Sequence, residues 1–200
     1  MGRAWVKGRK HDRYYLAAKR QSYRSRSAIK LAQIDNRYGV FEPGDVVVDL
    51  GAAPGGWSQV ARERIGPEGR VLAVDRIGFP PIDGVESIRG DFAERTTQAR
   101  VFEALRRPAD VVLSDMAPHL SGHREYDAAR SFELAEAARS FAVRALRDSG
   151  TLLVKVFPGE DYRAFVARLR ADFIDVRALK PKASSARSAE IFLLARGRTF

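Results

Sequence analysis

The chain has 200 residues, of which 45% are hydrophobic, and this suffices for one folded domain with a sizeable core. It contains no cysteine, so disulfides, thiolate metal sites and cysteine nucleophiles are excluded. No apolar run approaches the length of a membrane span, and the formal net charge of +10 favours nucleic acid as the partner.

The positive charge is concentrated near the N-terminus. Residues 1–30 hold ten of the 35 Lys and Arg residues and a single acid, Asp12. Four aromatic residues lie among these charges: Trp5, Tyr14, Tyr15 and Tyr23. Cations neutralise phosphates, and aromatic rings stack on bases. We therefore predict a basic, partly flexible nucleic-acid-binding arm over residues 1–26 and a single domain over residues 27–200; a solvated, disordered tail is the alternative.

Beyond the arm, short apolar runs alternate with amphipathic segments. Apolar spacing, a serine cap and a glycine stop predict a first helix over residues 27–39. Strands are predicted over residues 45–50, 70–75, 85–91, 109–115, 150–157, 174–180 and 189–197. Further helices are predicted over residues 57–66, 93–106, 127–147 and 161–173. This alternation predicts a doubly wound α/β fold whose mostly parallel sheet is covered by helices on both faces.

A glycine-rich turn, "DLGAAPGGWSQ", follows the first strand. Its glycines are Gly51, Gly55 and Gly56. Glycines at the carboxyl end of a strand let the backbone approach a ligand closely. Trp57 and Ser58 stand where a Walker A loop needs Lys and Ser or Thr, and Ala53-Pro54 breaks the GxGxxG pattern. A cofactor with a pyrophosphate group is therefore disfavoured.

Carboxylates end the next strands: Asp75, Asp91 and Asp115. Asp75 lies 24 residues after Gly51, which matches the acid that binds ribose hydroxyls in nucleotide sites. Asp91 is placed where it can accept a hydrogen bond from an adenine amino group. A nucleoside cofactor without a diphosphate indicates S-adenosylmethionine. A tight turn with surface acids is the alternative, and a lone Asp115 is often a helix cap.

The run "TLLVKVFPG" places Lys155 within a predicted buried strand. A lysine is almost never fully buried without a partner. Either its stem lies on apolar neighbours while the amine reaches solvent, or the residue has a function. Helices on both faces of the sheet weaken the first explanation.

The sequence predicts no metal site. The histidines are His11, His119 and His123. The last two are four residues apart, but Ser121-Gly122 between them argues against a helix that carries two ligands. No cluster of acids completes a site near them.

Five motifs resemble those of the FtsJ/RrmJ-type ribosomal RNA large-subunit methyltransferases. In chain order they are "SRSAIKL", "VVDLGAAPGGWSQ", "SDMAP", "LLVKVF" and "SSARSAEIF", and the resemblance covers about residues 22–196. It implies a Rossmann-like methyltransferase fold with a seven-stranded sheet. It also implies transfer of a methyl group from S-adenosylmethionine to a ribose 2′-hydroxyl of RNA, and hence RNA as the ligand of the arm.

The resemblance further implies the site residues. The family's Lys-Asp-Lys-Glu catalytic tetrad falls on Lys30, Asp115, Lys155 and Glu190. The expected cofactor-binding residues are Gly51, Ala52, Ala53, Pro54, Gly55, Gly56, Trp57, Asp75, Asp91, Phe92 and Asp115. His119 stands where several members carry Asn, which leaves the tetrad intact and changes the local substrate contacts.

A ribose hydroxyl is a poor nucleophile unless a base removes its proton during attack. We expect Lys155 to be this base, Asp115 and Glu190 to orient and balance it, and Lys30 to help place the 2′-oxygen. A lysine accepts a proton only when it is neutral. Burial and nearby positive charge favour the neutral amine, whereas nearby carboxylates oppose it.

The resemblance implies the A-loop uridine of 23S rRNA in the large ribosomal subunit as the target, and a monomeric, cytoplasmic enzyme. Basic residues near Glu190 are expected to bind RNA phosphates with the arm: Arg177, Lys180, Lys182 and Arg187. The alternatives are 2′-O-methylation of tRNA or of an mRNA cap, and a non-catalytic RNA-binding factor in ribosome assembly. A mitochondrial transit peptide would have to be cleaved upstream of "SRSAIK", because that motif carries Lys30.

Overall fold

The computed structural model describes residues 22–118, 124–185 and 188–199, together with Tyr14, Leu16 and Ala18; of residues 124–128 it describes the backbone alone. In this part of the chain, seven strands form one sheet in the order β3-β2-β1-β4-β5-β7-β6. The strands that pair in parallel are β1 (Val46–Leu50), β2 (Arg70–Asp75), β3 (Val85–Arg89), β4 (Ala109–Ser114) and β5 (Leu146–Val156). The strand β7 (Ile191–Arg198) runs antiparallel to both β5 and β6 (Phe173–Leu179).

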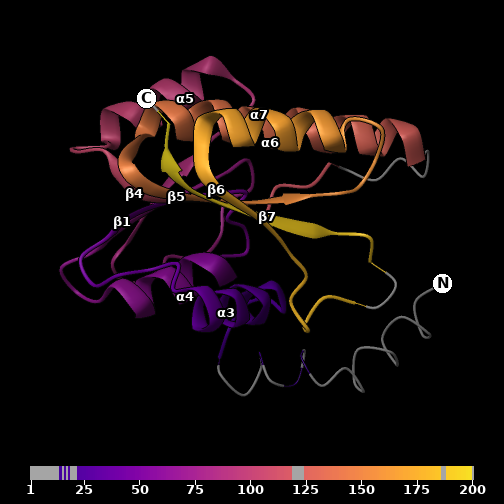
Figure 1. Cartoon of the computed structure of the whole chain (residues 1–200). Coiled ribbons are helices and arrows are strands. Elements are labelled where there is room, and N and C mark those ends of the chain that lie inside the picture. Colours follow the sequence, from indigo (N-terminus) through magenta and orange to yellow (C-terminus); the bar gives the residue numbers. More distant parts are fainter. Residues whose placement is uncertain are drawn as a thin grey trace.

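Helices cover both faces of the sheet (Figure 1). On one face lie α5 (Arg95–Ala104), α6 (Arg124–Ala145) and α7 (Tyr162–Asp172), and on the other lie α3 (Ser27–Tyr38) and α4 (Gly56–Ile65). Successive residues of a strand point to opposite faces. In β5, Val154 and Val156 therefore pack in the core under α6 and α7, whereas Leu153 packs in the core over α3 and α4. The predicted doubly wound fold with its mostly parallel sheet is confirmed.

Every predicted helix and strand is present, but several ends differ by a few residues. The strand β5 begins at Leu146, four residues before the predicted start, and its register with β4 shifts between Ala109 and Val111. The strand β3 ends at Arg89, so Asp91 lies in the turn after it. That turn carries the Asp91 carboxylate to the edge of a cavity described below.

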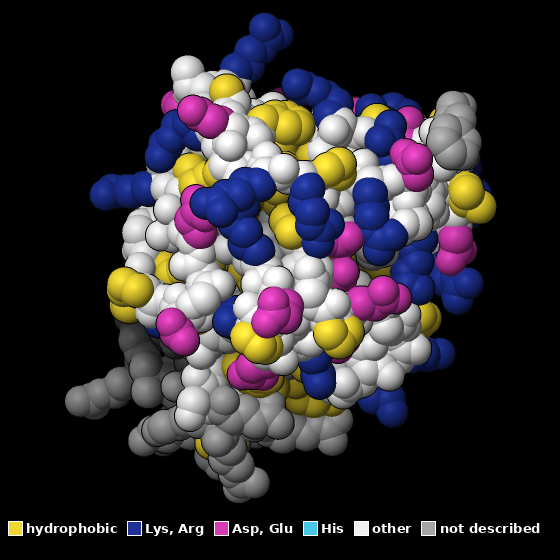
Figure 2. All heavy atoms as spheres, turned by 90° about the vertical axis from the view of Figure 1, so that its left-hand side faces the viewer, with side chains coloured by type: hydrophobic (Ala, Val, Ile, Leu, Met, Phe, Trp, Pro, Cys, Tyr) yellow, Lys and Arg dark blue, Asp and Glu magenta, His cyan; other side chains and the backbone are white. Residues whose placement is uncertain are grey.

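Basic and acidic side chains are interspersed on the side of the molecule that Figure 2 shows. At the start of the parallel strands, Asp110 lies 2.7 Å from Arg107 and 2.5 Å from Arg147. Arg70 and Glu86 form another pair at 2.5 Å. Such pairing agrees with the near balance of 25 Lys and Arg against 24 Asp and Glu over residues 31–200. Among the described helices, none has the length and apolarity needed to cross a bilayer.

Candidate active site

Strand register brings three tetrad residues together at the carboxyl edge of the sheet. The pairing of β4 with β5 places Asp115, the residue after the end of β4, beside Lys155. The pairing of β5 with β7 places Phe192 opposite Lys155, and Glu190 precedes Phe192 by two residues. Because Phe192 belongs to the core over α3 and α4, these side chains extend from the face that those helices cover.

Lys155 is buried and is held by Asp115. Its side chain is 8% exposed, and its Nζ donates to Asp115 Oδ1 at 2.8 Å and to the Asp115 carbonyl oxygen at 2.7 Å. An ammonium group has three hydrogens, so one position remains for another acceptor or for a substrate hydroxyl. If the side chain only lay on apolar neighbours, its amine would reach bulk solvent. The amine instead lies buried against Asp115, so this explanation is wrong.

The second lysine comes from the helix layer. Lys30 lies on α3, and its Nζ donates to Oε1 of Glu190, just ahead of β7. The same nitrogen lies 5.9 Å from the centre of the Phe192 ring. Burial raises the pKa of Glu190, but the hydrogen bond and charge of Lys30, with the charge of Lys155, outweigh burial and lower the pKa below its ordinary value. Glu190 is therefore an ionised acceptor at neutral pH.

The tetrad residues thus form two neighbouring ion pairs, Lys155–Asp115 and Lys30–Glu190. The influence of the Lys155 charge on Glu190 shows that the two pairs share one electrostatic environment. Carboxylates fix the position of each amine, and a positioned amine can hold or exchange a proton with a bound hydroxyl. The arrangement therefore suits proton transfer at a polar substrate group.

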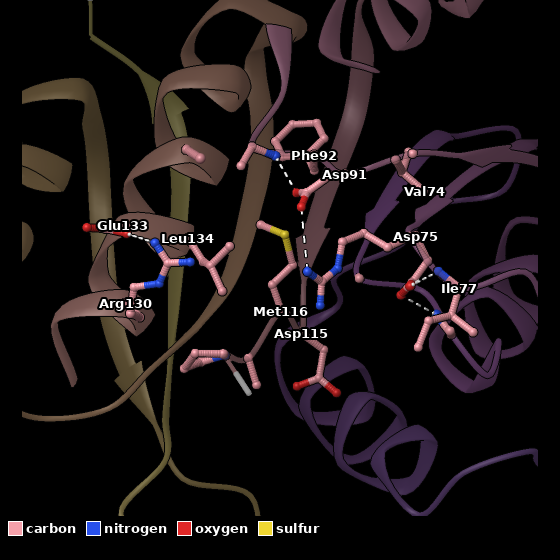
Figure 3. A pocket seen from close by; sticks show the side chains of 18 residues that line it. Val74, Asp75, Ile77, Asp91, Phe92, Asp115, Met116, Arg130, Glu133 and Leu134 are labelled. Carbon is pink, nitrogen blue, oxygen red and sulfur yellow. Dashed lines mark hydrogen bonds and ion pairs between the residues drawn. The ribbon is translucent and has the colours of Figure 1, made fainter. Parts of the chain in front are cut away.

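A cavity of about 450 Å³ opens beside Asp115 (Figure 3). Its lining comes from the strand ends, namely Gly51, Ala53, residues 74–77, 90–93 and 115–118, and from Arg130, Glu133, Leu134 and Ala137 of α6. Figure 3 shows Asp75 and Asp91 on one side of the cavity and Leu134 on the other, with Met116 between them. Acceptor oxygens that face apolar side chains suit a nucleoside, whose sugar hydroxyls donate hydrogen bonds and whose base has flat, apolar faces.

Backbone N–H groups hold two of the carboxylates that line this cavity, those of Asp75 and Asp91. Asp75 accepts from the Ala53 N–H at 2.9 Å and from the Ile77 N–H at 2.8 Å, one bond on each carboxylate oxygen. Asp91 accepts from the Ala93 N–H at 3.0 Å. A carboxylate offers about four lone-pair sites, so each still has capacity for hydroxyl or amino groups of a ligand.

The expected cofactor-binding residues divide into two groups. Those that line the cavity are Gly51, Ala53, Asp75, Asp91, Phe92 and Asp115. Those that do not line it are Ala52, Pro54, Gly55, Gly56 and Trp57. The Trp57 ring is buried, donates its Nε1–H to the Ser27 carbonyl at 2.9 Å and packs 5.7 Å from the Phe192 ring. This tryptophan therefore joins α4 to α3 and to the core.

The glycines of the turn make room for protein segments. A Cβ atom on Gly56 would lie 2.1 Å from Ser25 Oγ, and one on Gly55 would lie 2.7 Å from Ile82 Cδ1. Gly51 has a φ of +77°, and a Cβ there would lie 2.7 Å from Met116 Cγ. The structure shows that the chain itself closely approaches these glycines around the cavity; close approach of a ligand stays a prediction.

We expect Gly51→Ala to lower the free energy of unfolding by about 1–3 kcal/mol more than Gly66→Ala, because overpacking costs about that much. The two glycines have similar positive φ values, +77° and +71°, but nothing lies within 4 Å of a Cβ on Gly66. Urea unfolding of both variants measures the difference. Equal losses of stability would show that Met116 moves aside at no cost.

Asp49, next to the glycine turn, is a buried acid that the sequence analysis passed over. It is fully buried, and its Oδ2 accepts from Ser58 Oγ at 2.6 Å, whereas Oδ1 has no hydrogen-bond partner among the described residues. Burial raises the pKa of Asp49 to about 7; the Ser58 bond opposes the rise, and the negative charges of Asp115 and Asp75 add to it. The signal was available, because Asp49 interrupts the apolar run "VVVDL" as Lys155 interrupts its own strand.

Arg24, just ahead of the first motif, also went unnoticed. Its guanidinium donates to the carbonyl of Pro80 at 2.5 Å and to that of Pro81 at 2.8 Å, and its backbone N–H donates to Gln59 Oε1 at 2.8 Å. Arg24 therefore connects the start of the domain to α4 and to the loop between β2 and β3. Its sequence context, a run of alternating Arg and Ser, did not distinguish it from the arm.

Several predictions concern residues outside the described part of the chain. These residues are His11, His119, His123, Arg187 and most of the arm, including residues 1–13. Among the residues that the structure does describe, no group of three or more His, Asp or Glu side chains is placed to hold a metal ion.

Comparison with known proteins gives concordant matches. A protein of Azoarcus sp. (strain BH72), "Ribosomal RNA large subunit methyltransferase E", is 48% identical over 193 residues, which cover 96% of this chain and 94% of the relative. A protein of Methanothermobacter thermautotrophicus with the same name is 44% identical and covers 98% of this chain and 94% of its own. The crystal structure of a ribosomal RNA methyltransferase from Plasmodium falciparum matches with a TM-score of 0.78 and 29% identity, covering 88% of this chain and 98% of that one.

A more distant structure shares the fold. Fibrillarin from Aeropyrum pernix, solved with S-adenosyl-L-methionine, matches with a TM-score of 0.56 and 20% identity over 86% of this chain and 75% of its own. The family model of the FtsJ-like methyltransferases covers residues 23–198, which include the glycine turn and both lysine–carboxylate pairs. The chain therefore belongs to the FtsJ-like methyltransferase family.

Proposed function

We propose that this chain transfers a methyl group from S-adenosylmethionine to a ribose 2′-hydroxyl of large-subunit ribosomal RNA. The observation that carries the proposal is the arrangement of two neighbouring lysine–carboxylate pairs, one of which, Lys155–Asp115, borders a nucleoside-sized cavity through Asp115. The near full-length relatives at 48% and 44% identity, which are named as methyltransferases of large-subunit ribosomal RNA, support it.

The lining of the cavity fits S-adenosylmethionine. Asp75 would accept from the ribose hydroxyls and Asp91 from the adenine amino group, while Phe92 and Leu134 would contact the base. When bound, this cofactor supplies an electrophilic methyl group on a sulfonium. Asp115 lies between the cavity and Lys155, so its charge would favour binding of a cation there.

The proton of the 2′-hydroxyl would pass to Lys155 Nζ as the oxygen attacks. In the neutral amine that this step requires, the two N–H groups donate to Asp115 and the lone pair remains to accept the hydroxyl proton. Lys30, held by Glu190, would donate to the 2′-oxygen and align it for displacement in line with the leaving sulfur. Lys155 and Glu190 are buried, and Lys30 and Asp115 are only partly exposed, which limits competition by water at the nucleophile.

Labelled methyl transfer tests this function. Large ribosomal subunits, free large-subunit rRNA and tRNA are offered with labelled S-adenosylmethionine, and the modified nucleoside is identified by digestion and mass spectrometry. We expect 2′-O-methyluridine at the A-loop, formed by a cytoplasmic monomer. Methylation of tRNA or of a cap alone would favour those substrates. RNA binding without any transfer would favour an assembly factor.

The basic arm is proposed to bind RNA phosphates beside the site. Deletion of residues 1–13 removes five Lys and Arg residues. We expect the slope of log Kd for rRNA against log salt to decrease by about 0.7–0.9 for each phosphate contact that is lost. Filter binding over a range of salt concentrations measures this slope. An unchanged slope would mean that the arm is a solvated tail.

A further inference from the structure

The reaction leaves Asp49 without a role, although this residue is a fully buried carboxylate on the strand before the glycine turn. In β1, Asp49 lies beside Ala73 of β2 and beside Leu113 of β4. Asp75 and Asp115, which Figure 3 shows at the cavity, follow those two residues by two positions. Residues two apart in a strand point to the same face. Asp49 therefore shares a face of the sheet with two carboxylates of the cavity, one strand repeat before them.

The distance from Asp49 to a ligand in the cavity is short. Gly51 follows Asp49 by two residues, lines the cavity and carries no side chain. Two residues of a strand span about 6–7 Å. Asp49 itself does not line the cavity. Its charge nevertheless acts strongly on a charge bound there, because protein interior screens electrostatic interactions much less than water does.

The groups that influence Asp49 most are two negative charges and one hydroxyl. Oδ2 accepts from Ser58 Oγ at 2.6 Å, and Oδ1 has no hydrogen-bond partner among the described residues. Burial raises the pKa of Asp49 to about 7, and the charges of Asp115 and Asp75 add to the rise. On β5, Lys155 is bonded to Asp115. The charged side chains of α3 and α4 contact other groups: Lys30 with Glu190, Arg64 with Asp35, Arg37 with Tyr38, Arg62 with the Gly66 carbonyl and Glu63 with Tyr23.

The cofactor and its product differ in one charge at this place. S-adenosylmethionine carries a positive sulfonium, and loss of the methyl group leaves S-adenosylhomocysteine with a neutral thioether. The two molecules share the adenine, the ribose and the amino-acid end. A bound sulfonium offsets the charges of Asp75 and Asp115, and it therefore favours the ionised form of Asp49. The neutral product provides no such compensation.

We propose that Asp49 is a specificity-determining residue that loses its proton to the solvent when S-adenosylmethionine binds and keeps it when S-adenosylhomocysteine binds. The inference rests on the proposed function, because it requires the sulfonium to lie beside Asp115 in the cavity. Asp49 acts through its charge and touches neither ligand. Its ionised form strengthens binding of the reactive cofactor, and its protonated form removes that advantage once the methyl group has been transferred.

The expected pH dependence has a definite sign. At low pH, Asp49 is protonated with and without the cofactor, so the affinity does not depend on its titration. As pH rises toward 7, the complex ionises before the free protein, so binding releases a proton and the affinity for S-adenosylmethionine increases. Above about pH 7 the free protein is ionised as well, and the affinity levels off. A unit charge about 8–12 Å away, at an effective dielectric constant of about 20, gives a total change of roughly tenfold to thirtyfold.

Calorimetric titration of the full chain with each ligand between pH 5 and 8 tests the proposal. In the wild type, the Kd for S-adenosylmethionine should fall roughly tenfold to thirtyfold up to pH 7, while the Kd for S-adenosylhomocysteine changes less than about threefold. In Asp49→Asn, the two ligands should give parallel profiles, and S-adenosylmethionine should bind more weakly than in the wild type at pH 7.5 by that same factor. Buffers of different ionisation enthalpy should show that the wild type releases about 0.4 proton more than Asp49→Asn per cofactor bound at pH 7.

Two further variants provide a control and an independent test. Asp148→Asn removes a carboxylate whose side chain is 70% exposed, and it should keep the wild-type difference between the ligands. Ser58→Ala retains Asp49 and remains informative if Asp49→Asn folds poorly. It removes a hydrogen bond that favours the ionised carboxylate, so the pH at which the affinity for S-adenosylmethionine levels off should rise by about one unit. An unchanged or lower value would contradict the proposal.

Failure of this inference is distinguishable from failure of the proposed function. Parallel pH profiles of the two ligands in the wild type, or an undiminished difference between them in Asp49→Asn, would overturn the inference alone, provided that the wild type still transfers methyl groups to rRNA. Binding of neither ligand, or binding without methyl transfer to any RNA, would overturn the proposed function and this inference with it.

Discussion

Lys155→Ala is expected to lower the rate of methyl transfer to rRNA by about 10²–10⁴-fold, the usual contribution of a general base. Lys155→Arg should be nearly as slow, because a guanidinium stays protonated in proteins and cannot accept the hydroxyl proton. Single-turnover transfer with saturating S-adenosylmethionine and ribosomal subunits measures the effect on the chemical step. Lys155 is buried and bonded twice to Asp115, so unfolding curves should accompany the rates.

The arginine variant separates two roles for this residue. If Lys155 contributed only positive charge beside Asp115, Lys155→Arg would keep most of the activity that Lys155→Ala loses. Near-wild-type rates in both variants would exclude either role. Arg163→Ala, which removes an exposed positive charge from α7, is the matched control and should leave the rate within about twofold, as for a surface substitution.

Asp49→Asn is expected to remove a large pH dependence from the stability of the domain. The pKa of Asp49 is raised to about 7 in the folded protein, whereas an aspartate in an unfolded chain titrates near 3.9. Between these values the folded state binds more protons than the unfolded state, so the free energy of unfolding decreases as pH rises. The contribution of protonated Asp49 to the free energy of unfolding is complete below about pH 4 and is lost as pH rises through 7. The shift corresponds to roughly 4 kcal/mol, at 1.36 kcal/mol per pH unit.

The measurement compares two variants with the wild type by urea unfolding between pH 4.5 and 8. The stability of Asp49→Asn relative to the wild type should increase up to about pH 7 and then level off, because the asparagine cannot ionise beside Asp75 and Asp115. Asp148→Asn removes a carboxylate from an exposed position and controls for the loss of one charge. Parallel pH profiles of Asp49→Asn and the wild type would mean that water or movement of α4 solvates the carboxylate.

The sequence alone was sufficient for the order and type of the elements. Strands such as "VVVDL" are continuous apolar runs because both faces of a parallel sheet are covered, and the helices between them carry an apolar stripe. Such periodicity is a local property of the sequence, so it can be recognised without knowledge of the fold. The ends of β3 and β5 were less predictable, since the register shift near Ala109 depends on a neighbouring strand.

The sequence also indicated where chemistry occurs. A charged residue within an apolar strand has few explanations, and this rule singled out Lys155; applied to "VVVDL", it would have found Asp49 as well. The members of the tetrad came from ordered motifs that resemble a family. The same motifs did not indicate which lysine pairs with which carboxylate, or that Gly55 and Gly56 face protein segments.

Only the tertiary structure decided those relations. Lys30 and Glu190 are 160 residues apart, and they meet because α3 packs under the sheet where β7 enters it. Lys155 bonds to Asp115 because β4 and β5 lie in register, and Asp49 is fully buried because α4 covers it and supplies Ser58. A small cavity beside Lys30 and Glu190 likewise exists because a loop after β6 docks on Arg26. Each relation depends on packing between distant segments, whose geometry no local pattern of residues encodes.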